Sequence, residues 1–276
     1  MQGIPIQIFA EPPDGQAPPE FTFDVRTSKP MLVSVQGRPL FWSCTATAHY
    51  GRTIDSMFPT PSAAAMHYRL AWRSARDASL LRGQIRWTAP EEYVKPNGRP
   101  SARRQVLAED AELLFDFFEY SMSAAMSAYA AIEAFCNQTI SDKASIPIRV
   151  KRRRPGSGRE EVVGLSIEEA ERQLTTEEKL KKVVPECLGQ RSPAGDTRVW
   201  PAYKLLKDVR DSVTHFKRKD QVRTETEDPS EQTALQKMVD TEPYEYAEAA
   251  LAVISHFEAP ENSIRWLRAN YAQRAG

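Results

Sequence analysis

The spacing of apolar residues changes near residue 100 and divides the chain into two parts. Up to about residue 48, short runs rich in β-branched and aromatic residues alternate with Pro and Gly, a pattern typical of strands joined by turns. The runs are Ile6–Phe9, Phe21–Val25, Met31–Val35 and Leu40–Ala46. We expect them to form a small sheet.

A helix and a loop complete the first part. Residues Pro61–Leu81 are predicted to be helical, because apolar residues recur there at steps of three and four and would form one buried side. Residues Thr88–Ser101 contain three prolines and the pair Asn97-Gly98, which predicts a linker or a surface loop. Residues 1–101 are therefore expected to form a small α+β segment, whose role the sequence does not reveal.

The second part has the periodicity of helices. Residues Ala108–Ile140 are predicted to form one long helix, with aromatic residues in its first half and small residues in its second, where a neighbouring helix can approach closely. Further helices are expected from Ser166, from Thr176 toward Leu188 with Pro185 distorting or ending it, and at Ala202–Phe216, Tyr244–Phe257 and Ser263–Tyr271. We therefore predict a mainly α protein, α+β overall, with residues 102–276 as a helical bundle.

A basic segment, Val150–Arg159, interrupts the helices and is broken by Pro and Gly. Such a segment is either a solvated loop or a clamp for the RNA backbone. In the second case its four consecutive basic residues would contact phosphates. They are Lys151, Arg152, Arg153 and Arg154.

Composition limits the classes of function. The 276 residues include 37 Lys and Arg against 37 Asp and Glu, so affinity for nucleic acid must come from local patches. The three cysteines are far apart and lack the spacing of metal ligands, which favours a reducing compartment and no metal site. The N-terminus does not resemble a signal peptide, and the longest apolar run, Tyr120–Cys136, contains three serines and Glu133. We expect a cytoplasmic protein that does not enter a membrane.

The strongest chemical signal is the sequence Arg210-Asp211-Ser212-Val213-Thr214-His215 near the end of a predicted helix. A permanently charged guanidinium close to a side chain that titrates near neutral pH suits the cleavage of a phosphodiester. Asp211 lies four residues before His215, so on a helix its carboxylate would face the imidazole and could orient it. Alternatively, Arg210 is a half-buried structural arginine and His215 a solvated histidine.

Two further groups of residues accompany this motif. Lys217, Arg218 and Lys219 follow it directly and would form a cationic edge suited to a polyanionic substrate. Glu133 and Asn137 lie four residues apart on one face of the long helix. They either form an exposed polar edge or reach Arg210 inside the bundle.

The motif Arg210-Asp211-x-x-x-His215 resembles the Arg-x(4–6)-His signature of HEPN domains (higher eukaryote and prokaryote nucleotide-binding). The run from Ser127 to Asn137 is also similar to the long earlier helix of these domains. The resemblance covers roughly residues 108–257 and implies a HEPN-like helical bundle. It further implies a toxin-like or antiviral-defence endoribonuclease acting as a homodimer, often restrained by an antitoxin or another regulatory protein.

For such an enzyme we expect Arg210 and His215 to be catalytic, Asp211 to orient His215, and Glu133 and Asn137 to support them. Neither a metal nor a cofactor is needed, because the 2′-hydroxyl of RNA is itself the nucleophile. The alternative is a non-catalytic HEPN-like module that binds nucleotides, RNA or a protein. A third possibility is that the N-terminal segment is the functional domain and the bundle only dimerises it.

Overall fold

A computed structural model describes most of residues 61–260 and, before them, a few strands. The described residues are Arg26, 61–94, 98, 100–153, 160–215, 233–260, 264 and 266–267, together with the backbone of strands between residues 6 and 59. This part is mainly helical with small antiparallel sheets, so the predicted fold class is confirmed. Contacts divide the chain into two compact units, Met1–Met66 with Ile264–Gly276, and His67–Ser263.

The first unit contains the short strands that the sequence predicted, with two differences. Strands β1 (Ile6–Phe9), β2 (Leu32–Val35) and β3 (Arg38–Phe41) form an antiparallel sheet, and β4 (Cys44–Thr47) pairs with β5 (Ser56–Pro59). The run at residues 40–46 was expected to be one strand because its apolar pattern is continuous. In the structure it is divided between β3 and β4. Strand β5 was not predicted, and the run at residues 21–25 lies outside the described residues.

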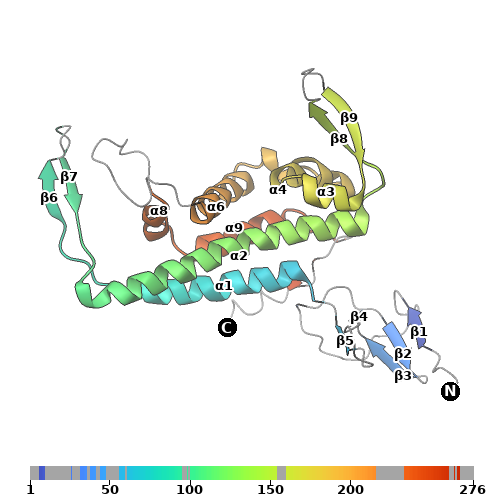
Figure 1. Cartoon of the computed structure of the whole chain (residues 1–276), viewed down its shortest axis with the longest axis horizontal. Coiled ribbons are helices and arrows are strands. Elements are labelled where there is room, and N and C mark those ends of the chain that lie inside the picture. Colours follow the sequence, from blue (N-terminus) through green and yellow to red (C-terminus); the bar gives the residue numbers. More distant parts are fainter. Residues whose placement is uncertain are drawn as a thin grey trace. The chain divides into compact units, whose positions relative to one another are not determined.

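Two long helices form the frame of the second unit. Helix α2 (Ala111–Lys143) follows a short 3-10 turn, η1 (Ala108–Asp110), and most of α1 (Ala63–Arg82) lies along it (Figure 1). Alanines are buried on both helices, including Ala75 and Ala124. The hydroxyls of Ser74 and Ser123 are 3.0 Å apart across this contact. Both helices were predicted to within three residues at each end.

The remaining helices cover α2. Helices α6 (Val199–Thr214) and α9 (Tyr244–Ser255) contact α2 and each other, and α8 (Ala234–Asp240) packs on α6. Phe135 of α2 stacks on Phe257, with ring centroids 5.8 Å apart. Because side chains from α2, α6 and α9 fill one core, the predicted helical bundle is confirmed for this unit.

A π-helical turn lies between α2 and α6. The chain forms α3 (Ile167–Gln173), α4 (Thr176–Glu178), the π-helix η2 (Lys179–Val183), α5 (Val184–Leu188) and the 3-10 turn η3 (Pro193–Gly195). Ser166 and Thr175 cap α3 and α4 with reciprocal side-chain bonds to Glu169 and Glu178. Pro185 has no N–H, and the wider π-turn comes directly before it, so the predicted distortion is confirmed.

Two segments expected as loops are β-hairpins instead (Figure 1). Strands β6 (Glu91–Val94) and β7 (Pro100–Arg103) replace the predicted linker, with Gly98 at a φ of 77° between them. Residues 150–153 of the predicted basic loop belong to strand β8 (Ile148–Arg153), which pairs with β9 (Glu160–Leu165), and residues 154–159 lie outside the described residues. In the register of this hairpin, Arg152 lies opposite Glu161 and Arg153 opposite Glu160.

The contact-based division differs from the composition-based boundary at residue 101. Contacts place most of α1 and the hairpin β6–β7 in the same unit as the bundle. The boundary expected from composition lies later in the chain and would assign α1 and β6 to the N-terminal segment. Among the described residues, no helix combines the length and apolar character needed to cross a membrane.

Candidate functional site

Helix α6 carries the predicted motif, and its start and end are both fixed by hydrogen bonds. The Asp196 carboxylate accepts the backbone N–H groups of Arg198 and Val199 at 2.8 and 2.9 Å. At the other end, the N–H of His215 donates to the carbonyl of Asp211 at 3.1 Å, and His215 itself has a non-helical φ of −129° and ψ of 68°. The helix therefore ends between the two residues expected to be catalytic.

Arg210 is half-buried, with 34% of its side chain exposed. Its Nη1 donates to Asp211 Oδ1 at 2.7 Å, and its Cζ lies 4.5 Å from the ring centroid of Tyr129 on α2. Partial burial lowers the pKa of Arg210, but the hydrogen bond to Asp211 and the charge of Glu133 outweigh it and raise the pKa above its ordinary value. The guanidinium is thus charged and held at the α2–α6 contact.

Tyr129 was not identified from the sequence as part of this site. Its ring stacks on that of Tyr203, at 6.3 Å between centroids, and burial raises the pKa of Tyr203 well above its ordinary value. The signal that could have found Tyr129 is helical spacing, since it lies four residues before Glu133 and eight before Asn137. These three positions share the face of α2 that meets α6 and η2.

His215 is exposed, and the contact expected to orient it is not present among the described residues. The Asp211 carboxylate instead contacts Arg210 at 2.7 Å and Lys207 at 3.7 Å. Two cations thus lie beside this carboxylate. A four-residue spacing brings side chains together only on a helix, and the φ and ψ of His215 are not helical. The expected role of Asp211 toward His215 therefore has no contact to support it in this structure.

Glu133 and Asn137 are both partly buried, and they have different partners. The charge of Glu133 raises the pKa of Arg210. Asn137 does not point to Arg210, because its Oδ1 accepts a hydrogen bond from Lys179 Nζ at 2.7 Å. Glu133 and Asn137 therefore do not act on the same cation: Glu133 acts on Arg210, and Asn137 binds Lys179.

Lys179 begins the π-helical turn and is completely buried. Its ammonium group donates to Asn137 Oδ1 and, at 2.8 Å, to the carbonyl oxygen of Glu171. Beside it, burial raises the pKa of the Cys136 thiol to about 12. Cys136 therefore stays protonated near neutral pH.

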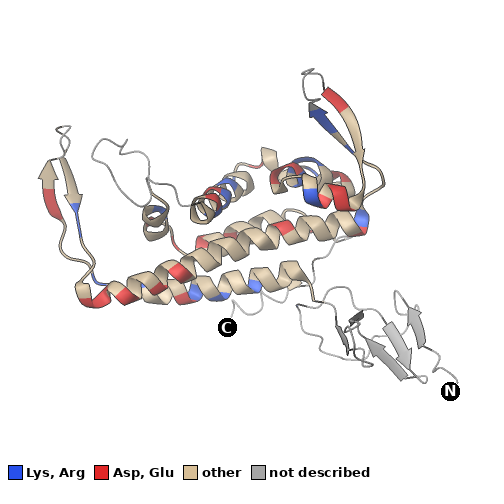
Figure 2. Ribbon diagram, in the orientation of Figure 1, with Lys and Arg blue, Asp and Glu red and all other residues tan. Residues whose placement is uncertain are grey.

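An ion cluster joins α4 and η2 to α6, a part of the chain where Figure 2 shows residues of both charge signs. Its centre is the Glu177 carboxylate, which lies 2.7 Å from Lys181 Nζ, 2.8 Å from Lys204 Nζ and 3.9 Å from Lys207 Nζ. Hydrogen bonds from Lys181 and Lys204 lower the pKa of Glu177 to about 2. Both ammonium groups also lie over the ring of Trp200, at 5.2 and 5.3 Å from its centroid.

The residues predicted to contact RNA phosphates are only partly described. Lys217, Arg218, Lys219 and Arg154 lie outside the described residues, as does the side chain of Arg153. Lys151 is exposed on β8. The Arg152 guanidinium donates to the side chain and the carbonyl of Gln173 at 3.1 and 3.4 Å, so it ties the hairpin to the end of α3.

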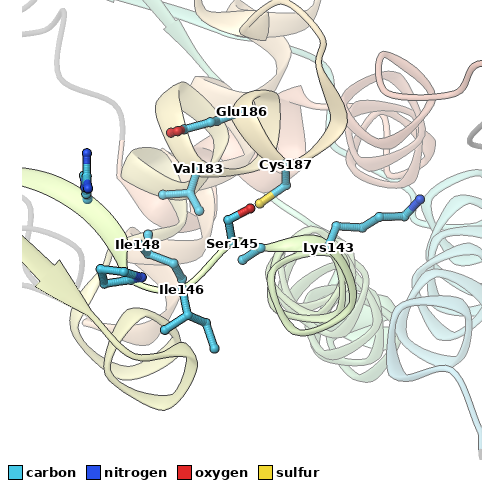
Figure 3. A pocket seen from close by; sticks show the side chains of 10 residues that line it. Lys143, Ser145, Ile146, Ile148, Val183, Glu186 and Cys187 are labelled. Atoms are coloured by element: carbon cyan, nitrogen blue, oxygen red, sulfur yellow. The ribbon is translucent and has the colours of Figure 1, made fainter.

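A cavity of about 340 Å³ lies away from these residues, between the end of α2, the start of β8 and the η2–α5 segment (Figure 3). The side chains of Ser145 and Cys187 lie next to each other there, and Val183 and Ile148 form part of its wall. Burial and the charge of Glu186 raise the pKa of Cys187, so its thiol is not an activated nucleophile. None of the predicted site residues lines this cavity.

Comparisons with known proteins add no assignment. No protein-family model, no curated protein and no solved structure matches the chain. Within the described residues, His, Cys, Asp and Glu nowhere form a group of three or more that could hold a metal ion. The chemistry of the site therefore has to be argued from the side chains themselves.

Proposed function

We propose that the chain is a metal-independent endoribonuclease of the HEPN type. Arg210 and His215 carry the proposal. His215 takes the proton from a ribose 2′-hydroxyl and then protonates the leaving 5′-oxygen, while Arg210 stabilises the charge that builds up on the phosphorus-bound oxygens. The 2′-hydroxyl attacks the adjacent phosphate, which leaves a 2′,3′-cyclic phosphate and a free 5′-hydroxyl. DNA lacks this nucleophile and should not be cut.

The main support is the way the guanidinium of Arg210 is held. Its Nη1 is bonded to Asp211 and its plane lies over Tyr129, so the group is fixed while a third of the side chain stays exposed. A positioned, charged donor of this kind is suited to a phosphate oxygen. His215 is exposed just beyond the last turn of the same helix, where a substrate can reach it.

The test is incubation of the purified protein with RNA in EDTA, followed by analysis of the product ends. We expect cleavage with 2′,3′-cyclic phosphate ends, and a loss of about two orders of magnitude or more in rate for His215→Ala, since a general acid–base group is removed. His67→Ala on α1 is the matched control and should cut at the wild-type rate. Cleavage that depends on added magnesium, or an unchanged rate in His215→Ala, contradicts the proposed chemistry.

A non-catalytic module that binds RNA, nucleotides or a protein is the second candidate. The observation that favours it is that Asp211 is bonded to Arg210, so no described carboxylate orients His215. For this candidate RNA binding would remain in His215→Ala, and no cleavage would be seen in either protein. A toxin-like or defence role, restraint by an antitoxin or regulatory protein, and a cytoplasmic location belong to the same proposal.

A further inference from the structure

Helix α6 presents a surface that the predicted site does not include. Trp200, Lys204, Lys207 and Asp211 follow one another at steps of four, three and four residues, so they share one face of the helix and extend about 16 Å along it. Lys181 joins them from η2. We call Trp200 with Lys181, Lys204 and Lys207 the α6 stripe. It leads along the helix toward His215.

The three lysines of the α6 stripe converge on one carboxylate. Glu177 is only 21% exposed and faces three positive charges, of which Lys207 also lies 3.7 Å from Asp211, the partner of Arg210. Two carboxylates thus face the three lysines and Arg210, so positive charge is in excess. The structure thus displays how the stripe holds an anionic oxygen. A phosphate brings such oxygens with the same hydrogen-bonding capacity.

Trp200 gives the stripe a second kind of contact. The indole is half-buried, and its ring packs at 4.9 Å between centroids against the buried Tyr203, which fixes its orientation. The ammonium groups of Lys181 and Lys204 lie over the ring. A fixed aromatic ring between cations is the arrangement that holds single-stranded nucleic acid, because bases stack and phosphates pair.

We propose that the α6 stripe binds single-stranded RNA and directs it to His215. A backbone phosphate displaces Glu177 from Lys181, Lys204 and Lys207, and an adjacent base stacks on Trp200 as the ammonium groups turn to the phosphate. Glu177 then acts as an internal competitor of the RNA. This inference rests on the proposed function, since it names the substrate class and the binding path of the same helix.

The experiment measures binding without cleavage. The probe is a short fluorescein-labelled oligouridylate with 2′-O-methyl sugars, which has no free 2′-hydroxyl to attack the phosphate, and the readout is fluorescence anisotropy with the full-length chain. We expect Trp200→Leu to bind about tenfold more weakly and Trp200→Phe to stay close to wild type, because stacking needs a ring. Thermal unfolding followed by circular dichroism shows whether Trp200→Leu is folded.

Two charge variants test the competition. Glu177→Gln should bind the probe several-fold more tightly, because the competing carboxylate is neutralised and the lysines are released. Lys204→Gln should weaken binding and reduce the slope of log K against log salt by about 0.7, the value for one lost contact on a single strand. Arg76→Gln on α1, another exposed cation paired with a carboxylate, is the control and should change neither quantity.

The outcomes separate this inference from the nuclease proposal. Wild-type affinity in Trp200→Leu, or weaker binding in Glu177→Gln, overturns the RNA path. If the lysine variant alone loses affinity, the surface attracts anions such as acidic peptides without reading bases, and the proposal is also wrong. If the protein binds the probe tightly but does not cut RNA in EDTA, RNA binding by the α6 stripe is supported and the nuclease proposal is wrong. If the protein cuts RNA and Trp200→Leu cuts it equally well, the nuclease proposal is supported and the α6 stripe is not the path of the RNA.

Discussion

At the scale of single residues, two cations that pack against α2, Arg210 and Lys179, differ in whether they can reach a substrate. Arg210 is partly exposed and bonded to a carboxylate, so part of its hydrogen-bonding fork can still meet a phosphate. Lys179 is completely buried, and its ammonium is bonded to Asn137 and to a backbone carbonyl. It cannot reach a substrate without local opening. Its contribution is to join η2 to α2 next to the proposed site.

The bond between Lys179 and Asn137 gives a prediction at this scale. Asn137→Ala should lower the free energy of unfolding by about 3 kcal/mol, because it leaves a buried ammonium without a side-chain acceptor. Asn137→Asp keeps an oxygen at the same place and should lose much less. Urea denaturation of both variants measures the difference. Equal losses in the two variants would show that the acceptor is unimportant and that only packing matters.

At the scale of elements, the sequence was informative where one periodicity acts over many residues. It predicted α1, α2, α6 and α9, because apolar side chains repeat along them. It also predicted the start of α3 at Ser166, whose side chain forms a capping box in the structure. It missed the hairpins, since their strands expose most side chains and depend on partners across the turn. Pro and Gly in these segments favoured the prediction of a linker and a loop.

The site shows the same division between local and distant information. Arg210, Asp211 and His215 are close in sequence, so the sequence was enough to select them, but their spacing suggested a contact of Asp211 with His215 and not the observed one with Arg210. The contacts of Tyr129 with Arg210, and of Asn137 with Lys179, join residues separated by 81 and 42 positions. Such pairs follow from the packing of α2 against other elements, which apolar periodicity alone does not specify.

The hairpin β8–β9 provides a prediction at the element scale. Strand β9 passes so close to Pro147 that a Cβ at Gly164 would lie 2.9 Å from the Cβ of Pro147. Gly164→Ala should therefore destabilise the protein by about 1–3 kcal/mol through overpacking. Gly195→Ala is the matched control, since nothing lies within 4 Å of a Cβ at that position. Thermal unfolding should separate the two variants; similar melting temperatures would mean that the strand shifts freely.

At the scale of the whole molecule, the open question is whether one chain completes the proposed site. On a continuous helix, five residues would place Arg210 and His215 about 140° apart, which argues for a two-fold dimer that combines two copies of each. This angle does not apply to the observed helix, because α6 ends at Thr214 and His215 has a non-helical φ and ψ. A site within one chain is therefore geometrically possible, and the homodimer stays a prediction that experiment must decide.

Mixing inactive chains decides it. We expect a dimer by mass measurement in solution, and we expect Arg210→Ala and His215→Ala chains to recover RNA cleavage when they are mixed and allowed to exchange. In a two-fold assembly each mixed dimer keeps one intact Arg210 and one intact His215, and random exchange makes about half of the dimers mixed, so at most about half of the wild-type rate should return. Mixing each variant with itself is the control. A strictly monomeric wild type that cuts RNA, with no recovery on mixing, would place Arg210 and His215 of one chain at the same phosphate, made possible by the end of α6 between them.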